Sequence, residues 1–404
     1  MSKSSVEVWL WLLLVMKPYN KKTNFILSGC NYDAAKACEQ IRDGKLLFLT
    51  DSEKRRADEV RMGDIRKVQK LCAENSVRII TLDDEEYPER LRNIENPPIV
   101  LFCAGSLEGL NERLTIAAVG ARSVSDYTIY ATEGIIAPLA KSGTVIVSGL
   151  ALGSDAAAHS ACLKAGGKTV GVLGCGILVN YPSENAELKR EIVNGGGAVI
   201  SELLPTAKSS GGYFPIRNRI ISGLSHGTLV LQAGVKSGSL LTANHALEQG
   251  REIFCIPPHD IFAPMYSGAA GLLRSGALPV FAYTDIMDAF TLTSSDNAVT
   301  AGAIVEPRQP EPSAVPKKST KKAPEKAAEN PEPPALKPDL NEDALTSLDP
   351  REAELLKLLF GRPADADYLM EKLEFEYDET SELLTSLEIC GYISKNRDGL
   401  YYVV

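Results

Sequence analysis

The sequence predicts an α/β protein whose core is a parallel β-sheet covered by helices on both faces. Short runs rich in Val and Ile recur from residue 77 onward, and most are separated by segments of helix length. Buried apolar strands that alternate with helices are typical of parallel sheets. Several of these runs also end in turns rich in Gly and Ser. The predicted strands are residues 77–81, 115–119, 145–147, 169–173, 198–200, 228–231 and 253–256.

Residues 1–75 predict a small helical domain ahead of this sheet. Apolar side chains there follow helical spacing, as at Ile65, Val68 and Leu71. The apolar run at residues 8–16 is far shorter than the roughly 20 residues of a membrane span. It also lacks a small-residue cleavage site, so we interpret it as a core helix. We expect this domain to be a packing cap without a ligand of its own, and we expect no membrane contact.

The rest of the chain divides into a core, a linker and a C-terminal domain. We assign residues 76–290 to the core and residues 291–342, which are rich in Pro, Ala, Lys and Glu, to a flexible linker. Residues 343–404 predict a winged helix, because three helices at 350–360, 367–374 and 378–390 precede a hairpin at 392–403. A chain of 404 residues is long enough for roughly two or three domains.

Charge and cysteine content narrow the class of protein. The formal net charge is -9, and from Asn341 to the end there are 6 basic and 15 acidic residues. The core is therefore close to neutral, so an anion site must be a local basic cluster. None of the 8 cysteines forms a CxxC pair. This pattern favours a reducing cytoplasm over a disulfide scaffold or a zinc site.

Two arginines and an aromatic residue in the core indicate a phosphate-bearing ligand. Phe214, Arg217 and Arg219 open an apolar segment, and buried arginine is costly unless it is paired. Guanidinium groups match phosphate oxygens in a bidentate way. Phe214 adds a flat face on which a nucleobase can stack.

The turns after the predicted strands are candidate anion sites. Gly120, Arg122 and Ser123 follow one strand, and Ser148 and Gly149 follow another. A third turn holds a lysine with two serines and a glycine. Backbone N–H groups at the start of a helix hold anions well. The third turn consists of Lys236, Ser237, Gly238 and Ser239.

Other polar residues allow alternative chemistry. Asp155 and His159 lie four positions apart and suit a metal or acid–base pair, but a third ligand at suitable spacing is missing. We therefore prefer Asp155 as a helix cap or loop organiser. Serine nucleophiles at Ser154, Ser237 or Ser239 would normally lie at the centre of a G-x-S-x-G elbow, and none of these three serines does. We expect no metal site at the isolated residues His226, His245 and His259.

Taken together, these residues resemble the DNA-processing protein A family (DprA, also called Smf). Gly-Ala-Arg at 120–122 and Phe-Pro-Ile-Arg-Asn-Arg at 214–219 are among the matching stretches, which occur in the expected order over most of residues 77–280. The other matches are residues 87–91, 96–102, 148–159, 166–169, 172–176, 181–185, 200–202, 220–225 and 237–243.

The resemblance implies a Rossmann-like core that binds single-stranded DNA, usually as a homodimer, with a SAM-like N-terminal domain. It implies that the protein protects incoming strands and loads the recombinase RecA onto them during natural transformation or recombination. It also implies that the protein helps to displace single-strand-binding protein. It implies no enzyme activity and no cofactor. The positions that match the family's DNA pocket are Arg122, Ser123, Ser148, Gly149, Phe214, Arg217, Asn218, Ser237, Gly238 and Ser239. Gly120, Arg219 and Lys236 complete our candidate set.

Two other functions remain possible for this chain, and the charge of the C-terminal domain argues against DNA binding there. A related Rossmann family hydrolyses nucleoside monophosphates, but Thr242 stands where its catalytic Glu would be, and Thr cannot act as a carboxylate. This substitution argues for binding without turnover. The alternatives that stay open are such a hydrolase and a protein that senses a nucleotide in the same pocket. Pro258 and Ala270 also differ from the residues usual in the family. The acidic winged helix would repel phosphate, so we expect a protein contact or dimer support there.

Overall fold

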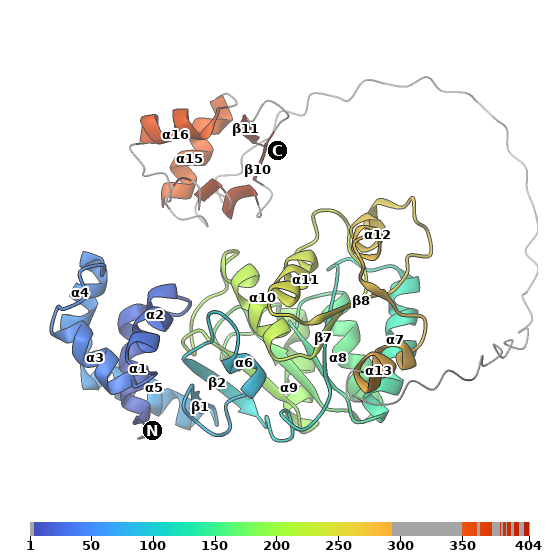
Figure 1. The fold of residues 1–404 in the computed structure, drawn as a ribbon, viewed down its shortest axis with the longest axis horizontal. Coiled ribbons are helices and arrows are strands. Elements are labelled where there is room, and N and C mark those ends of the chain that lie inside the picture. The colour runs from blue at the N-terminus through green and yellow to red at the C-terminus, as the bar shows by residue number, and fades with distance from the viewer. Residues whose placement is uncertain are drawn as a thin grey trace, which may run out of the picture. The chain divides into compact units, whose positions relative to one another are not determined.

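In the computed structural model the described residues are 4–292, 350–361, 364–373, 380, 383–384, 386–388, 392–395 and 400–403. The chain forms two compact units, Met1–Ser294 and Ser295–Val404, and we describe each one by itself. The first unit contains a helical segment and a large sheet (Figure 1).

The N-terminal segment consists of five helices. They are α1 (Val6–Met16), α2 (Lys21–Gly29), α3 (Ala34–Arg42), α4 (Asp51–Glu59) and α5 (Met62–Glu74). Helix α1 contacts all four of the others, and its Trp9, Leu10 and Leu12 are fully buried. The apolar run at residues 8–16 is thus part of a core helix, as its sequence predicts. Among the described residues, no helix has the length and apolar character needed to cross a membrane.

A single mixed sheet forms the centre of the first unit. Within residues 4–292 its nine strands have the order β1-β2-β6-β5-β4-β3-β7-β8-β9. All neighbours from β6 to β9 in this order are parallel, whereas β2 is antiparallel to both β1 and β6. The strands are β1 (Arg78–Thr81), β2 (Val100–Gly105), β3 (Thr115–Val119), β4 (Val145–Ser148), β5 (Thr169–Val172), β6 (Ala198–Ser201), β7 (Gly227–Val230), β8 (Glu252–Cys255) and β9 (Leu278–Pro279).

Helices cover both faces of this sheet. Alternating strand residues enter two different apolar clusters: Ile116 packs with α7 and α8, whereas Ala117 belongs to the cluster that includes residues of α9, α10 and α11. This alternation confirms the predicted α/β class with a mostly parallel sheet. The helices are α6 (Glu89–Arg92), α7 (Asp126–Lys141), α8 (Ser154–Lys164), α9 (Ala186–Asn194), α10 (Tyr213–Gly223), α11 (Ser239–Glu248), α12 (Ser267–Arg274) and α13 (Tyr283–Leu292).

The strand order places a topological switch point at the carboxyl edge of the sheet. Strand β3 lies between β4 and β7. Strands β4, β5 and β6 follow on one side of β3, and β7 and β8 lie on its other side. Loops that leave neighbouring strands at such a switch point diverge, and ligands of open α/β sheets bind there. The turns predicted to hold anions follow β3, β4 and β7.

The second unit has its own small core. Helices α15 (Pro350–Gly361) and α16 (Ala366–Leu373) pack with an antiparallel hairpin of β10 (Ile393–Lys395) and β11 (Tyr401–Val403). These elements agree with the predicted helices and hairpin. The expected third helix at 378–390 lies largely outside the described residues, as does the linker beyond residue 292. The winged-helix architecture therefore stays a prediction, as do the four domain boundaries.

Candidate nucleic-acid interface

The loops after β3, β4 and β7 meet at the carboxyl edge of the sheet. The N–H of Ala121 donates to the carbonyl of Gln232 over 2.9 Å, and the N–H of Ser154 donates to the carbonyl of Ala121 over 3.0 Å. A Cβ on Gly120 would lie 2.3 Å from Ser154 Oγ, so only glycine allows this packing. Gly120 thus joins the three loops rather than presenting a side chain.

Arg122 and Phe214 form the exposed part of the candidate interface. Arg122 and Ser123 are exposed, and the Arg122 guanidinium carbon lies 5.6 Å from the centroid of the Phe214 ring. Such a contact keeps a cation over an aromatic face. The half-buried Phe214 ring packs on the backbone of Gly174, where a Cβ would come within 2.5 Å of it.

A second aromatic side chain, Tyr181, belongs to the same surface. Its ring lies 5.4 Å from the Phe214 ring at an interplanar angle of 31°, and 41% of Tyr181 is exposed. The sequence alone predicted no contact between this tyrosine and DNA, although it lies in a family-like motif. Its position beside Phe214 depends on the fold, because Tyr181 comes from the loop between β5 and α9 whereas Phe214 lies in the first turn of α10.

Arg217 points inward and holds the β4 loop. One guanidinium nitrogen, Nη1, donates to the carbonyl of Gly149 over 2.7 Å and also to the carbonyl of Val172. Only 7% of Arg217 is exposed, and this burial lowers its pKa to about 10. In this conformation its donors are largely engaged within the chain, so Arg217 supports the interface from below.

Asp155 organises the same loop from the start of α8. Its Oδ2 accepts from the N–H of Gly149 over 3.1 Å and from the N–H of Ala151 over 3.3 Å. Burial raises the pKa of Asp155, although the Arg217 charge and these N–H donors oppose the rise. The role of loop organiser predicted from the sequence is therefore confirmed.

The neighbouring His159 stays inside the protein. Its Nδ1 shares a 2.7 Å hydrogen bond with Thr169 Oγ1, and burial lowers its pKa to about 3, with a further contribution from Arg217. Throughout the described ranges, no group of three or more His, Cys, Asp or Glu side chains could hold a metal ion. His159 is thus a neutral core residue at ordinary pH.

The β7 loop presents a lysine and the first residues of α11. Lys236 and Gly238 are exposed, and the hydroxyls of Ser237 and Ser239 share a 2.7 Å hydrogen bond. Asn218 Nδ2 donates to the carbonyl of Gly238 over 3.3 Å, which connects this loop to α10. The start of α11 carries the positive end of the helix dipole, which favours an anion, although the N–H groups of Ser239 and Leu240 donate to Ser237.

Like Arg217, two further candidates have their polar groups directed into the protein. The Ser148 hydroxyl is fully buried and donates to the carbonyl of Ala118 over 2.6 Å. Arg219 forms an ion pair of 2.7 Å with Glu202 and lies 4.9 Å from the Tyr19 ring. The structure thus gathers the other candidates around α10 and the three loops, while Arg219 faces the N-terminal segment.

Substituting Gly149 with Ala tests how tightly Arg217 and Asp155 pack against the β4 loop. A Cβ there would lie 2.6 Å from Arg217 Nη2 and 2.7 Å from Asp155 Oδ2, so we expect destabilisation by about 1–3 kcal/mol, as for overpacked sites. Gly238→Ala is the matched control, since a Cβ at Gly238 meets nothing within 4 Å. Urea denaturation should show a lower midpoint for Gly149→Ala alone; equal midpoints would contradict the packing argument.

The fold and this site define a class of protein: an α/β protein with exposed cations, aromatic rings and the start of a helix at the switch point of a parallel sheet. Residues 78–291 match the family model described as DNA recombination-mediator protein A. This match covers more than half of the chain, so the chain belongs to that family.

Relatives from several bacteria agree with this assignment. The chain is 39% identical over 215 residues to "DNA processing protein DprA" of Bacillus subtilis, covering 53% of this chain and 72% of that protein. It is 40% identical over 210 residues to "Protein Smf" of Escherichia coli, covering 52% and 56% of the two chains. The solved structure of DNA processing protein A from Streptococcus pneumoniae has 32% identity and a TM-score of 0.63, and the match covers 71% of this chain and 98% of that one.

Proposed function

We propose that this protein binds single-stranded DNA and acts as a recombination mediator without catalytic turnover. The observation that supports this proposal most strongly is the exposed Arg122 guanidinium over Phe214, with Tyr181 beside that ring. Cations that hold phosphates, together with rings on which bases stack, are typical of single-strand binding sites.

The roles divide between an exposed layer and a buried support. Arg122 and Lys236 would hold phosphates, the dipole at the start of α11 would favour them, and Phe214 with Tyr181 would stack on a base. Ser123 and Ser237 add hydroxyl donors at the rim. Beneath them, the support of this interface would consist of the buried residues Ser148, Gly149, Arg217 and Ser239 and the half-buried residues Gly120 and Asn218.

The action on RecA and on single-strand-binding protein extends this proposal. It rests on membership in the recombination-mediator family and on relatives named as DNA-processing proteins. Natural transformation or general recombination would then be the setting. A cytoplasmic location fits the cysteines from Cys30 to Cys255, all of which are free and buried.

A homodimer is also part of the proposal. Val235, Ile261, Phe262 and Met265 are between 42% and 89% exposed, and the last three lie just ahead of α12. Helix α12 contacts the β7 loop, because the N–H of Ala269 donates to the carbonyl of Ala233 over 3.0 Å. Large exposed apolar side chains of this kind suit association with a second copy.

The hydrolase alternative finds little support in the residues at α11. Thr242, at the position of the expected catalytic Glu, is 1% exposed and offers no carboxylate. A nucleotide sensor would use the same surface as the strand binder but would need only one nucleotide.

Competition between a mononucleotide and oligonucleotides of increasing length separates these functions. We expect affinity to rise steeply with length, because each added nucleotide brings a phosphate and a base to the surface. A mononucleotide that competes as well as a long oligonucleotide would favour the sensor, and release of a free base would favour the hydrolase.

A further inference from the structure

We propose that a crevice between the N-terminal helical segment and α10 binds a second nucleobase of the bound strand. This inference rests on the proposed single-strand binding and names a subsite for it. The crevice is partly open to solvent and lies between the turn at Pro18 and Tyr19 on one side and Tyr213 and Ile216 of α10 on the other.

The crevice is continuous with the candidate interface. Gly174 and Arg217 line it, and Gly174 is also the residue on which the Phe214 ring packs. A strand whose base lies at Phe214 would therefore have its neighbouring nucleotide close to the mouth of the crevice. Continuity with that interface is the reason for choosing the bound strand as the occupant.

The chemistry of the lining favours a base over a phosphate. Apolar side chains such as Leu173, Leu203 and Ile220 form most of the wall, and Tyr19 and Tyr213 add two aromatic rings. Flat, largely apolar bases suit such walls. Glu202, which also lines the crevice, would repel a phosphate but can accept a hydrogen bond from an N–H on the edge of a base.

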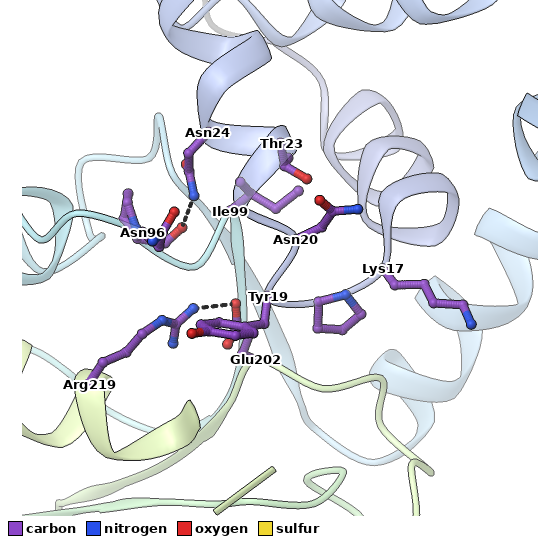
Figure 2. A pocket seen from close by; sticks show the side chains of 11 residues that line it. Lys17, Tyr19, Asn20, Thr23, Asn24, Asn96, Ile99, Glu202 and Arg219 are labelled. Atoms are coloured by element: carbon purple, nitrogen blue, oxygen red, sulfur yellow. Dashed lines mark hydrogen bonds and ion pairs between the residues drawn. The ribbon is translucent and has the colours of Figure 1, made fainter. Parts of the chain in front are cut away.

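Arg219 fixes the wall that Tyr19 contributes. Figure 2 shows the neighbouring pocket, in which Arg219 pairs with Glu202 and lies against the Tyr19 ring. Within the described residues, Nε and Nη1 of this buried arginine have no hydrogen-bond partner. Burying such donors is costly, and the cation–π contact offsets part of that cost. Arg219 is thus a positioning residue that acts through Tyr19.

The turn that carries Tyr19 also has an unusual backbone. Lys17 and Tyr19 adopt φ values of 64° and 61°, which non-glycine residues rarely adopt. Strain of this kind often marks a ligand clamp. Together with the arginine contact, it indicates that the Tyr19 ring is held in one place instead of packing freely.

A scan with a single abasic nucleotide tests this subsite. Short oligo-dT strands would carry the abasic nucleotide at successive positions, and fluorescence anisotropy would give each affinity. For the wild type we expect two sensitive positions, each losing roughly five- to hundredfold, the range for a lost base stack. One would correspond to Phe214 and the other to the crevice.

Variants assign the second position to Tyr19. In Tyr19→Ala the penalty at one position should disappear while the other remains, and Tyr19→Phe should keep both because the ring is retained. Ile216→Trp, which fills the crevice, should also remove that penalty, with thermal melting used to confirm folding. Tyr32→Ala, an exposed tyrosine of the same helical segment, is the matched control.

The result separates this inference from the proposed function. Wild-type binding with the same two penalties in Tyr19→Ala and Ile216→Trp would overturn the second subsite while leaving single-strand binding intact. Failure of the wild type to bind any strand would overturn both.

Discussion

Replacing Arg122 with Glu is expected to weaken binding of single-stranded DNA by roughly ten- to a hundredfold. Arg122 is an exposed cation above the Phe214 ring, so reversing its charge removes a phosphate contact and adds repulsion. Hydrogen bonds to charged groups contribute about 1.5–3 kcal/mol, which corresponds to this range. The slope of log affinity against log salt should also become shallower by about 0.7 for each lost phosphate contact.

Arg113→Glu is the matched control for this experiment. Arg113 is exposed and precedes β3, whereas Arg122 follows it, so the same charge change is made at opposite ends of one strand. Anisotropy titrations with oligo-dT should show a loss for Arg122→Glu and little change for Arg113→Glu. Equal losses would mean that net charge, and not the switch-point site, determines binding.

Replacing Arg217 with Met is expected to destabilise the protein by about 3–5 kcal/mol, the range for a buried charge left without its partner. The substitution removes the donor to the carbonyls of Gly149 and Val172, and it leaves Asp155 buried without a nearby positive charge. Urea denaturation followed by circular dichroism measures this loss. Because the β4 loop then lacks its support, binding should fall as well.

The double variant Arg217→Met with Asp155→Asn tests the proposed cause. The introduced amide would keep an oxygen that accepts from the N–H of Gly149 but would carry no charge, so part of the stability should return. If the double variant is less stable than Arg217→Met, the charge of Asp155 is not what makes the single substitution costly. If Arg217→Met has wild-type stability and only loses binding, Arg217 contacts DNA directly.

The sequence predicted the sheet well where buried strands alternate with helices. Six of the parallel strands, from β3 to β8, lie at predicted apolar runs, and four of those runs, at β3, β4, β5 and β7, end in turns rich in Gly and Ser. β2 was not predicted as a strand, and β1 pairs only with it in antiparallel orientation. Apolar content gives no strand direction, so this edge of the sheet could not be derived from it. β9 is a two-residue strand, too short to leave a pattern.

For the site, the sequence predicted the positions of the loops but not the directions of the side chains on α10. The sequence correctly placed Arg122 and the β7 loop at one edge of the sheet, because residues that follow parallel strands gather at the same edge. The direction of a side chain on a helix does not follow from its neighbours. Arg217 and Arg219 are two positions apart on α10, so they point to different partners. Tyr181 was overlooked because its contact with Phe214 joins a loop to a helix that is distant in the sequence.

The most direct measurement of the central claim is fluorescence anisotropy of labelled oligo-dT, titrated with the protein across salt and compared with the matching duplex. We predict binding that weakens as salt rises and that strongly favours the single strand, since exposed cations hold phosphates and aromatic rings need unpaired bases. An absence of binding at low salt, or equal affinity for the duplex, would contradict the proposed single-strand interface.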